Sequence, residues 1–295
     1  LSGARSGRAV SAFARSALTL SVLALSASFA SLGLAAAAPP VREQSESRSP
    51  LSGRSAEEMQ RVRCSEAHQG VAVDADHFYA ISNRNIGKYE KASGKQVAAW
   101  QDAPGGPLKH LNAGVVVEGR LYCAHSTYPS EPRLSSVEIW DTKTLQHVGN
   151  HSFGEYGGAL NWVDWHDGHW WAVFAWYGRE DGPDHVRRTT LVKFDDRWRR
   201  IAAWVFPAEL LERFATSSNS GGNWGPDGLL YCTGHDHKEM YALRIPRSGS
   251  TLQWVETVAV PFAGQALVWD ASQSGVVCGV NRSSREAGDA RVPER

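Results

Sequence analysis

Cysteine is scarce in this chain: its 295 residues include only four. Cys123, Cys232 and Cys278 occupy one position of a repeated phrase, where the other two copies have alanine. A position that accepts Ala or Cys needs a small, buried side chain, and equivalent positions of separate repeats are poorly placed to be bridged. We therefore expect no disulfide framework. A disulfide between Cys64 and one of the other three stays open in an exported protein.

An excess of charge of either sign is also missing. Lys and Arg total 31, and Asp and Glu total 31. This balance gives no global attraction to nucleic acid or to an anionic membrane. We therefore expect no nucleic-acid partner.

Long apolar runs are absent except near the start of the chain. There, residues 17–34 are apolar, Arg5, Arg8 and Arg15 precede them, and four alanines follow at 35–38. This pattern is typical of a signal peptide over 1–38. We expect export to the periplasm or the exterior and no membrane attachment after cleavage. An uncleaved anchor is the alternative.

The chain after the predicted signal peptide changes character twice. Residues 39–56 are rich in Pro, Ser and charge, which predicts a disordered linker. Residues 57–295 carry the repeats and are predicted to form one domain.

What the chain does have is repetition. A turn, a pair of apolar or aromatic residues and one small residue recur five times. The copies are residues 76–80, 119–123, 168–172, 228–232 and 274–278. Strand-rich repeats every roughly 40 to 60 residues are typical of propeller blades. The prediction is an all-β fold: a single β-propeller of five four-stranded blades, with six blades as the alternative.

A propeller must close its ring to remove exposed strand edges. The last blade opens well, but Arg285–Arg295 has only a weak strand pattern. Met59–Cys64 lies just before blade one, and we expect this N-terminal strand to complete the ring. Residues 207–214 predict a short amphipathic helix packed on a blade edge.

The up-and-down path of a blade brings two kinds of strand end to one face around the channel: the start of the innermost strand and the end of the second. In this chain those positions are polar. Candidate catalytic residues are His68, His110, His125 and His235. Candidate substrate-binding residues are Arg84, Asn112, Asn161, Asn219, Gln265, Arg282, Trp176 and Tyr177. Polar groups that converge on a channel mouth predict a site, although His and Asn at strand ends also commonly close turns.

Further features of the chain bear on this face. The long loops 126–134 and 178–188 follow second strands, so they fall on it and are expected to supply specificity or a lid. His166 and His169 flank a hairpin at the opposite face, and we interpret them as structural. Few Asp or Glu residues fall at the strand ends, which disfavours hydrolysis by paired carboxylates.

Two chemistries suit such a set of side chains. Neutral imidazoles can act as general acid and base while Arg84 or Arg282 holds a substrate carboxylate. They can instead bind a divalent metal ion together with a carboxylate such as Asp236. The sequence does not decide between them, so the cofactor stays open.

Most of the chain from His68 to Asn281 resembles a family of exported bacterial propeller proteins, some of them labelled cycloisomerase-like. The matching stretches are HQGVAVDADHFYAISN, SSVEIWDTKTLQHVG, NWVDWHDGHWWAVFAWY, SNSGGNWGPDGLLYCTGHD and GQALVWD. The chain is more distantly similar to propeller polysaccharide lyases that act beside a uronate carboxylate. The tail after Arg285 departs from the closing strand expected of such proteins.

Together these observations favour a secreted enzyme, a lyase or isomerase acting on a carboxylated sugar or lactone-like substrate. The alternative is a non-catalytic module that binds a glycan or a protein. Twelve Trp residues support the alternative, with Trp162, Trp176 and Tyr177 expected near the site, although indoles also fill the spaces between sheets. In either case we expect a small-molecule or glycan ligand at the central channel and a monomeric protein.

Overall fold

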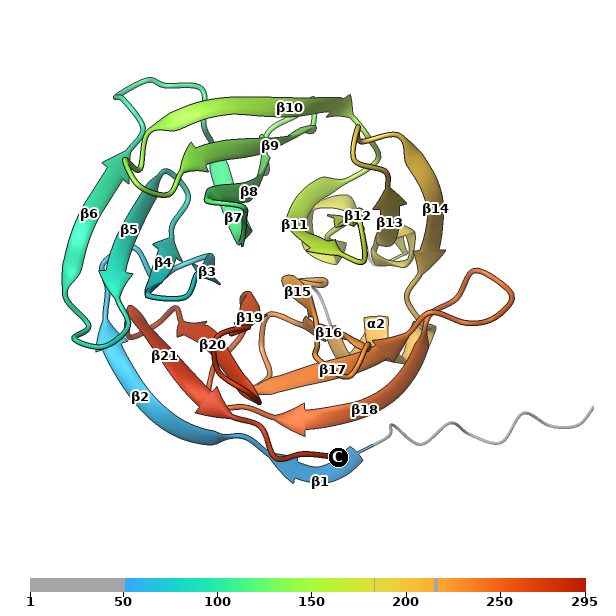
Figure 1. The fold of residues 1–295 in the computed structure, drawn as a ribbon. Helices are drawn as coiled ribbons and strands as arrows, with labels where there is room; N and C mark the ends of the chain where they lie inside the picture. The colour runs from blue at the N-terminus through green and yellow to red at the C-terminus, as the bar shows by residue number, and fades with distance from the viewer. Residues whose placement is uncertain (1–50, 183, 215–216) are drawn as a thin grey trace, which may run out of the picture. The chain divides into compact units, whose positions relative to one another are not determined.

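The computed structural model describes residues 51–182, 184–214 and 217–295. The predicted signal peptide and residues 39–50 of the predicted linker lie outside this part of the chain. The described residues form five sheets arranged around a central axis (Figure 1). The prediction of a five-bladed all-β propeller is therefore confirmed.

Blades one to three each contain four consecutive antiparallel strands, running from the axis outward. Blade one is β3 (Gly70–Val73), β4 (His77–Ile81), β5 (Asn85–Glu90) and β6 (Gln96–Gln101). Blade two is β7 (His110–Val117), β8 (Arg120–Ser126), β9 (Leu134–Asp141) and β10 (His147–Glu155). Blade three is β11 (Ala159–His166), β12 (His169–Ala175), β13 (Thr190–Phe194) and β14 (Arg200–Val205).

The last two blades use the chain start for their outer edges. Blade four is β15 (Gly221–Trp224), β16 (Leu230–Thr233), β17 (Glu239–Arg244) and β18 (Gln253–Ala259), with β1 (Leu51–Ser55) beyond β18. Blade five is β19 (Leu267–Trp269), β20 (Val276–Asn281), β21 (Glu286–Arg291) and β2 (Glu57–Arg63). The expected closure by an N-terminal strand is confirmed, because β2 pairs antiparallel with β21. The weak C-terminal strand is thus the third strand of its blade.

One part of the predicted linker is ordered. Residues 51–55 form β1, which pairs parallel with β18, so the prediction of disorder over 39–56 is wrong at its end. The physical reason lies in Arg54, whose Nε and Nη2 donate to the carboxylate of buried Glu256 at 2.6 and 2.9 Å. Arg295, the final residue, donates to the same carboxylate at 3.0 Å. Both ends of the domain therefore meet at Glu256.

Small residues let the innermost strands meet at the axis. A Cβ atom added to Gly70 of blade one would lie 2.9 Å from the Cα of Ala113 in blade two. A Cβ added to Gly221 of blade four would overlap Ala266, just before blade five. Between blades three and four, the fully buried indole of Trp162 packs against Gly222. The innermost strands of these neighbouring blades are therefore in close contact, and the two mouths of the channel hold separate cavities with no lining residue in common.

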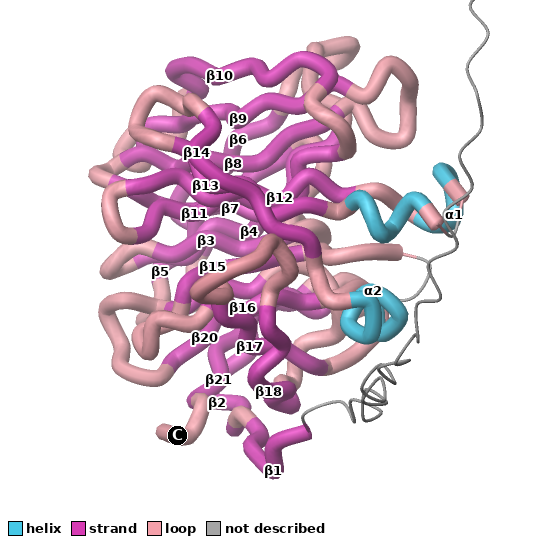
Figure 2. The backbone as a smooth tube through the Cα atoms, turned by 90° about the vertical axis from the view of Figure 1, so that its right-hand side faces the viewer, coloured by secondary structure: helices cyan, strands magenta, loops and turns pink. Residues whose placement is uncertain are grey.

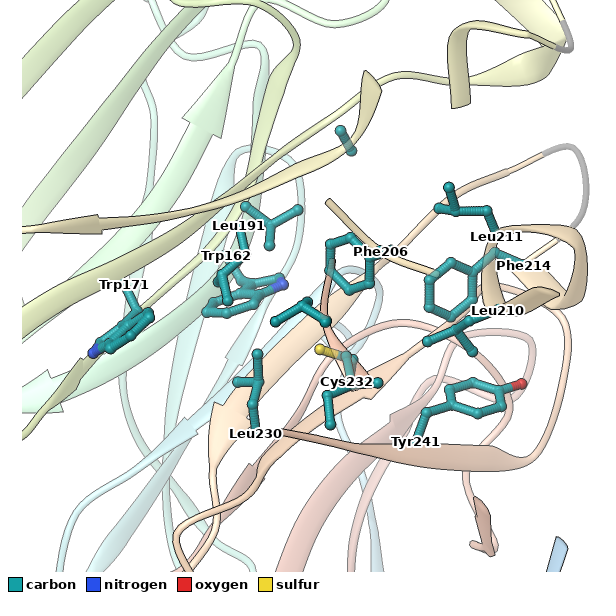
Figure 3. Close-up of a cluster of buried hydrophobic side chains, with 14 of the residues drawn as sticks. Trp162, Trp171, Leu191, Phe206, Leu210, Leu211, Phe214, Leu230, Cys232 and Tyr241 are labelled. Atoms are coloured by element: carbon teal, nitrogen blue, oxygen red, sulfur yellow. The ribbon is translucent and has the colours of Figure 1, made fainter. Parts of the chain in front are cut away.

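Among the described residues, three short helices lie in the blade connections: α1 (Gly178–Asp181), the 3-10 helix η1 (His185–Arg188) and α2 (Ala208–Phe214). Helices α1 and α2 lie on the same face of the ring (Figure 2). As predicted, α2 buries Leu210, Leu211 and Phe214, in a cluster with Phe206 and Tyr241 (Figure 3). No helix in the described ranges is long and apolar enough to span a bilayer.

The cysteines are packing residues. All four are buried and free, so the open alternative of a disulfide from Cys64 is not formed. Burial raises the pKa of the Cys64 thiol to about 11. It also raises the pKa of Cys123 and Cys278 well above the ordinary value. Thiols held protonated in this way are poor nucleophiles and poor metal ligands.

Candidate functional site

A cavity of about 380 Å³ occupies the channel mouth at which the innermost strands start. Each blade contributes one polar residue from the start of its innermost strand or just before it: Gln69, Asn112, Asn161, Ser220 and Gln265. The hydrogen bond from Gln69 Nε2 to Asn83 Oδ1, at 2.7 Å, joins this ring to the end of a second strand. Polar groups of the five blades therefore converge here, as the strand path predicts.

The charge at this mouth has one sign. Among the described residues that line the cavity are Lys109, Arg179 and Arg282, together with His110 and His235, and none is Asp or Glu. Positive groups in a concave site with low-dielectric walls attract anions. The cavity is thus suited to an anionic ligand.

Arg282, which follows β20, is central to this charge. Its Nε donates to Nε2 of His68 at 2.9 Å, and its Nη1 lies 3.4 Å from Nε2 of His235. Within the described residues no carboxylate pairs with this half-buried guanidinium. Burial and the nearby Arg285 lower the pKa of Arg282, which is the expected effect of an uncompensated charge.

His68 supports Arg282 and does not itself line the cavity. Because its Nε2 accepts a hydrogen bond, the ring is neutral and carries its proton on Nδ1. Burial, Arg282 and Arg285 lower the pKa of His68 to about 4. The imidazole therefore stays uncharged at neutral pH and orients the guanidinium.

His110, the first residue of β7, lines the cavity directly. Burial lowers its pKa to about 4, with further contributions from His125, Arg282 and His68. Its ring centroid lies 5.3 Å from that of Tyr128. A neutral imidazole at this position can accept a proton from a bound molecule.

His235 belongs to an acid–imidazole pair. Its Nδ1 lies 2.7 Å from Oδ1 of Asp236, which fixes Nε2 on the side of Arg282. A carboxylate that holds one ring nitrogen is the usual way to orient a catalytic imidazole. Among the described residues no group of three His, Cys, Asp or Glu side chains could hold a metal ion. The donor set therefore does not fit the metal site considered from sequence.

The remaining predicted histidine is placed elsewhere. His125, near the end of β8, is buried. Its Nε2 accepts the backbone N–H of Lys109 at 3.0 Å, and its Nδ1 contacts Oγ of Ser136 at 2.9 Å. Both ring nitrogens are thus engaged, and His125 holds the segment that presents Lys109 and His110.

Three further candidates also lie outside the cavity lining. Arg84 pairs with Asp102 at 2.7 Å. Fully buried Asn219 accepts from the indole of Trp162 at 2.6 Å. Trp176 donates to the carbonyl of Gly157 at 2.7 Å. These residues lie at strand ends on the face that holds the cavity, but their side chains form hydrogen bonds with other parts of the fold instead of lining the cavity.

Some lining residues were not selected from sequence, notably Tyr128, Arg179 and Lys109. Tyr128 and Arg179 lie in the two long loops that were expected on this face, so loop position was the available signal. The rings of Tyr128 and Tyr177 are 4.5 Å apart, and Tyr177 donates to Oδ1 of Asn161 at 2.7 Å. These two rings form an aromatic wall beside the basic groups.

A buried ion pair fixes the two loops to each other. Arg133 Nη1 bonds Oδ2 of Asp181 in α1 at 2.7 Å, and the same carboxylate oxygen accepts the backbone N–H of Tyr177 at 3.0 Å. The aromatic wall is thus held before any ligand arrives, which lowers the entropy cost of binding.

Known structures share this architecture. The structure is similar to a glutaminyl cyclase from Myxococcus xanthus, with a TM-score of 0.56 and 12% identity over 81% of this chain and 97% of that one. It is also similar to the PQQ-bound form of an aldose sugar dehydrogenase from Streptomyces coelicolor, with a TM-score of 0.54 and 9% identity over 83% and 100%. No protein-family model and no curated protein gives a significant match. At these identities the comparisons establish the fold: this chain is built as a β-propeller, as are enzymes of more than one kind.

Proposed function

We propose that the protein is an exported propeller enzyme, a lyase or isomerase that removes a proton next to the carboxylate of a sugar acid or lactone-like acid. The observation that carries this proposal is Arg282: a guanidinium at a cavity mouth, bonded to imidazoles and paired with no carboxylate of the described chain. A carboxylate of a ligand can accept two parallel hydrogen bonds from a guanidinium, so it is the partner that we expect for Arg282.

The chemistry follows from the neighbours of Arg282. With the carboxylate on Arg282, neutral His110 takes the proton from the adjacent carbon. The C–H electron pair spreads into the carboxylate, where the guanidinium stabilises the added charge. The bound anion also offsets the positive charge of Arg282 near His110, so the pKa of His110 rises toward a useful value for a base.

The proton must then be delivered. In an isomerase His110 returns it to a different carbon. In a lyase the bond between the neighbouring carbon and its oxygen breaks, and His110 passes the proton to the leaving oxygen, while His235, oriented by Asp236, helps to hold Arg282 in place. No step here uses a metal ion, because the described donor set does not form a metal site.

The substrate class is inferred from the walls. Tyr128 and Tyr177 offer an aromatic surface to a sugar ring, and the amides of Asn112 and Gln265 offer hydrogen bonds to hydroxyl groups. The resemblance to cycloisomerase-like propellers and, more distantly, to propeller polysaccharide lyases points the same way. The predicted signal peptide supports export, and a monomer is part of the proposal.

The test is proton exchange in deuterated water. A panel of uronates, oligouronates and hydroxy-acid lactones is incubated with the protein, and NMR follows the proton beside the carboxylate. Arg282→Met should lose exchange by at least about a hundredfold. Arg291→Met is the matched control, because Arg291 bonds the carbonyl of Ser274 on the protein surface and does not line the cavity. Binding without exchange in the native protein would instead support a non-catalytic glycan-binding module.

A further inference from the structure

A second cavity, of about 830 Å³, lies at the opposite mouth, where the innermost strands end. It is distinct from the site above, because the two cavities have no lining residue in common. Its walls include three partly exposed indoles: Trp165 at the end of β11, Trp224 at the end of β15 and Trp269 at the end of β19. Three large aromatic side chains gathered in one concave mouth are more than scattered surface residues.

The charge of this mouth is the reverse of the first. Its described lining contains Asp74, Asp164 and Asp270 and has no Lys or Arg. Asp74 and Asp270 are engaged: Asp74 accepts from Tyr79 at 2.6 Å, and Asp270 pairs with Lys91 at 2.6 Å.

Asp164 is different. It is 3% exposed, and its oxygens accept neutral donors: the backbone N–H groups of Trp165 at 2.9 Å and Trp224 at 2.8 Å, and the side chain of Asn223. No cation of the described chain pairs with it. A buried carboxylate without a counter-charge is costly, and a ligand that carries the missing cation would remove that cost.

The indoles restrict the kind of cation. A small metal ion needs several ligands close together, and the described residues of this mouth include no cluster of three His, Cys, Asp or Glu side chains that could hold one. A sugar needs available hydrogen-bond acceptors as well as donors, and two acceptors here are already used: Oδ1 of Asn223 accepts the backbone N–H of Trp269 at 2.8 Å, and Asp74 accepts from Tyr79. Aromatic faces beside a carboxylate fit an alkylated ammonium group, which is held by cation–π attraction and by charge.

We propose that this second mouth binds an organic ammonium cation, held by the indoles of Trp165, Trp224 and Trp269 with Asp164 as its counter-charge. The proposal does not depend on the enzymatic function proposed above. It gives a role to three Trp residues at the mouth where the innermost strands end, for which the sequence predicts no ligand.

Calorimetric titration with choline tests the proposal. The matched probe is the neutral carbon isostere of choline, in which a tert-butyl group replaces the trimethylammonium group. The assay is run at about pH 8.5, where Asp164 is ionised. We expect choline to bind at least about tenfold more tightly than the isostere. Equal binding of the two would show a merely apolar pocket and overturn the proposal, as would binding of cellobiose but not choline.

Variants place the binding at this mouth. Asp164→Asn should weaken choline binding at least about tenfold, and Trp269→Phe should weaken it to a smaller extent. Asp167→Asn is the control: this exposed residue is in the same hairpin, does not line the cavity, and has a positive φ of 51° that Asn adopts readily. Unchanged choline affinity in both test variants would refute the site. If Asp164→Asn does not fold, the isostere comparison and Trp269→Phe still decide.

Discussion

At the scale of single residues, Asp164 couples stability to pH. Burial raises its pKa to about 7, above the ordinary value of 3.8. The folded state therefore holds this proton more tightly than the unfolded state, so the free energy of unfolding falls as pH rises from about 4 to about 7.

Asp164→Asn should remove this dependence. Relative to the parent, the variant should gain on the order of a few kcal/mol between pH 5 and pH 8, even if it loses a constant amount because Asn accepts fewer hydrogen bonds. Urea unfolding at both pH values measures the change, with Asp167→Asn alongside. If the free energy of unfolding differs between variant and parent by the same amount at pH 5 and at pH 8, then Asp164 does not bind the proton that couples stability to pH.

His68 is a positioning residue, and its variants should separate that role from proton transfer. His68→Leu removes the acceptor for Arg282 and should raise KM for an anionic substrate about tenfold. His68→Gln keeps an acceptor oxygen near the position of Nε2 and should recover most of the loss. Because the pKa of His68 is about 4, neither variant should shift the pH profile of kcat/KM between about pH 6 and pH 8. A shifted profile would make His68 an acid or base instead.

At the scale of elements, the contact between innermost strands depends on glycine. A Cβ at Gly221 of β15 would overlap Ala266, so Gly221→Ala forces two blades apart. We expect a loss of about 1–3 kcal/mol in the free energy of unfolding. Gly149→Ala in β10 is the control, because nothing lies within 4 Å of the added atom. Equal stability of the two variants would mean that the blades can separate without cost.

Most strands could be predicted from the sequence, because the alternation of apolar and polar residues and the turn residues between strands are local properties. It missed β1 because the composition of residues 39–56 is that of a linker, and the pairing of Arg54 with Glu256 joins positions about two hundred residues apart. The same limit applies to the site. Seven of the candidate residues line the cavity: His110, His235, Asn112, Asn161, Gln265, Arg282 and Tyr177. His125, Arg84, Asn219 and Trp176 do not, because the partner that turns each side chain away could not be read from strand position alone.

At the scale of the whole molecule, ring closure depends on the first strands of the domain. A chain that starts at residue 57 loses β1 and the ion pair from Arg54 but keeps β2, so it should fold with reduced stability. A chain that starts at residue 65 leaves blade five with three strands and an open edge, and should aggregate or unfold. Circular dichroism during thermal unfolding and light scattering compare the two. Cooperative unfolding of the shorter chain at the parent temperature would contradict closure by β2.

The opposite charges of the two channel mouths have an electrical consequence. One end of the axis presents Lys109, Arg179 and Arg282, and the other presents the carboxylates of Asp74 and Asp164, since Asp270 is paired with Lys91. Although the chain's formal net charge is zero, this separation makes the ring an axial dipole. Near a negatively charged matrix or polymer the molecule would align with its basic end inward and its acidic end toward solvent. A protein with no overall attraction to such a surface would then still attach to it in a preferred orientation.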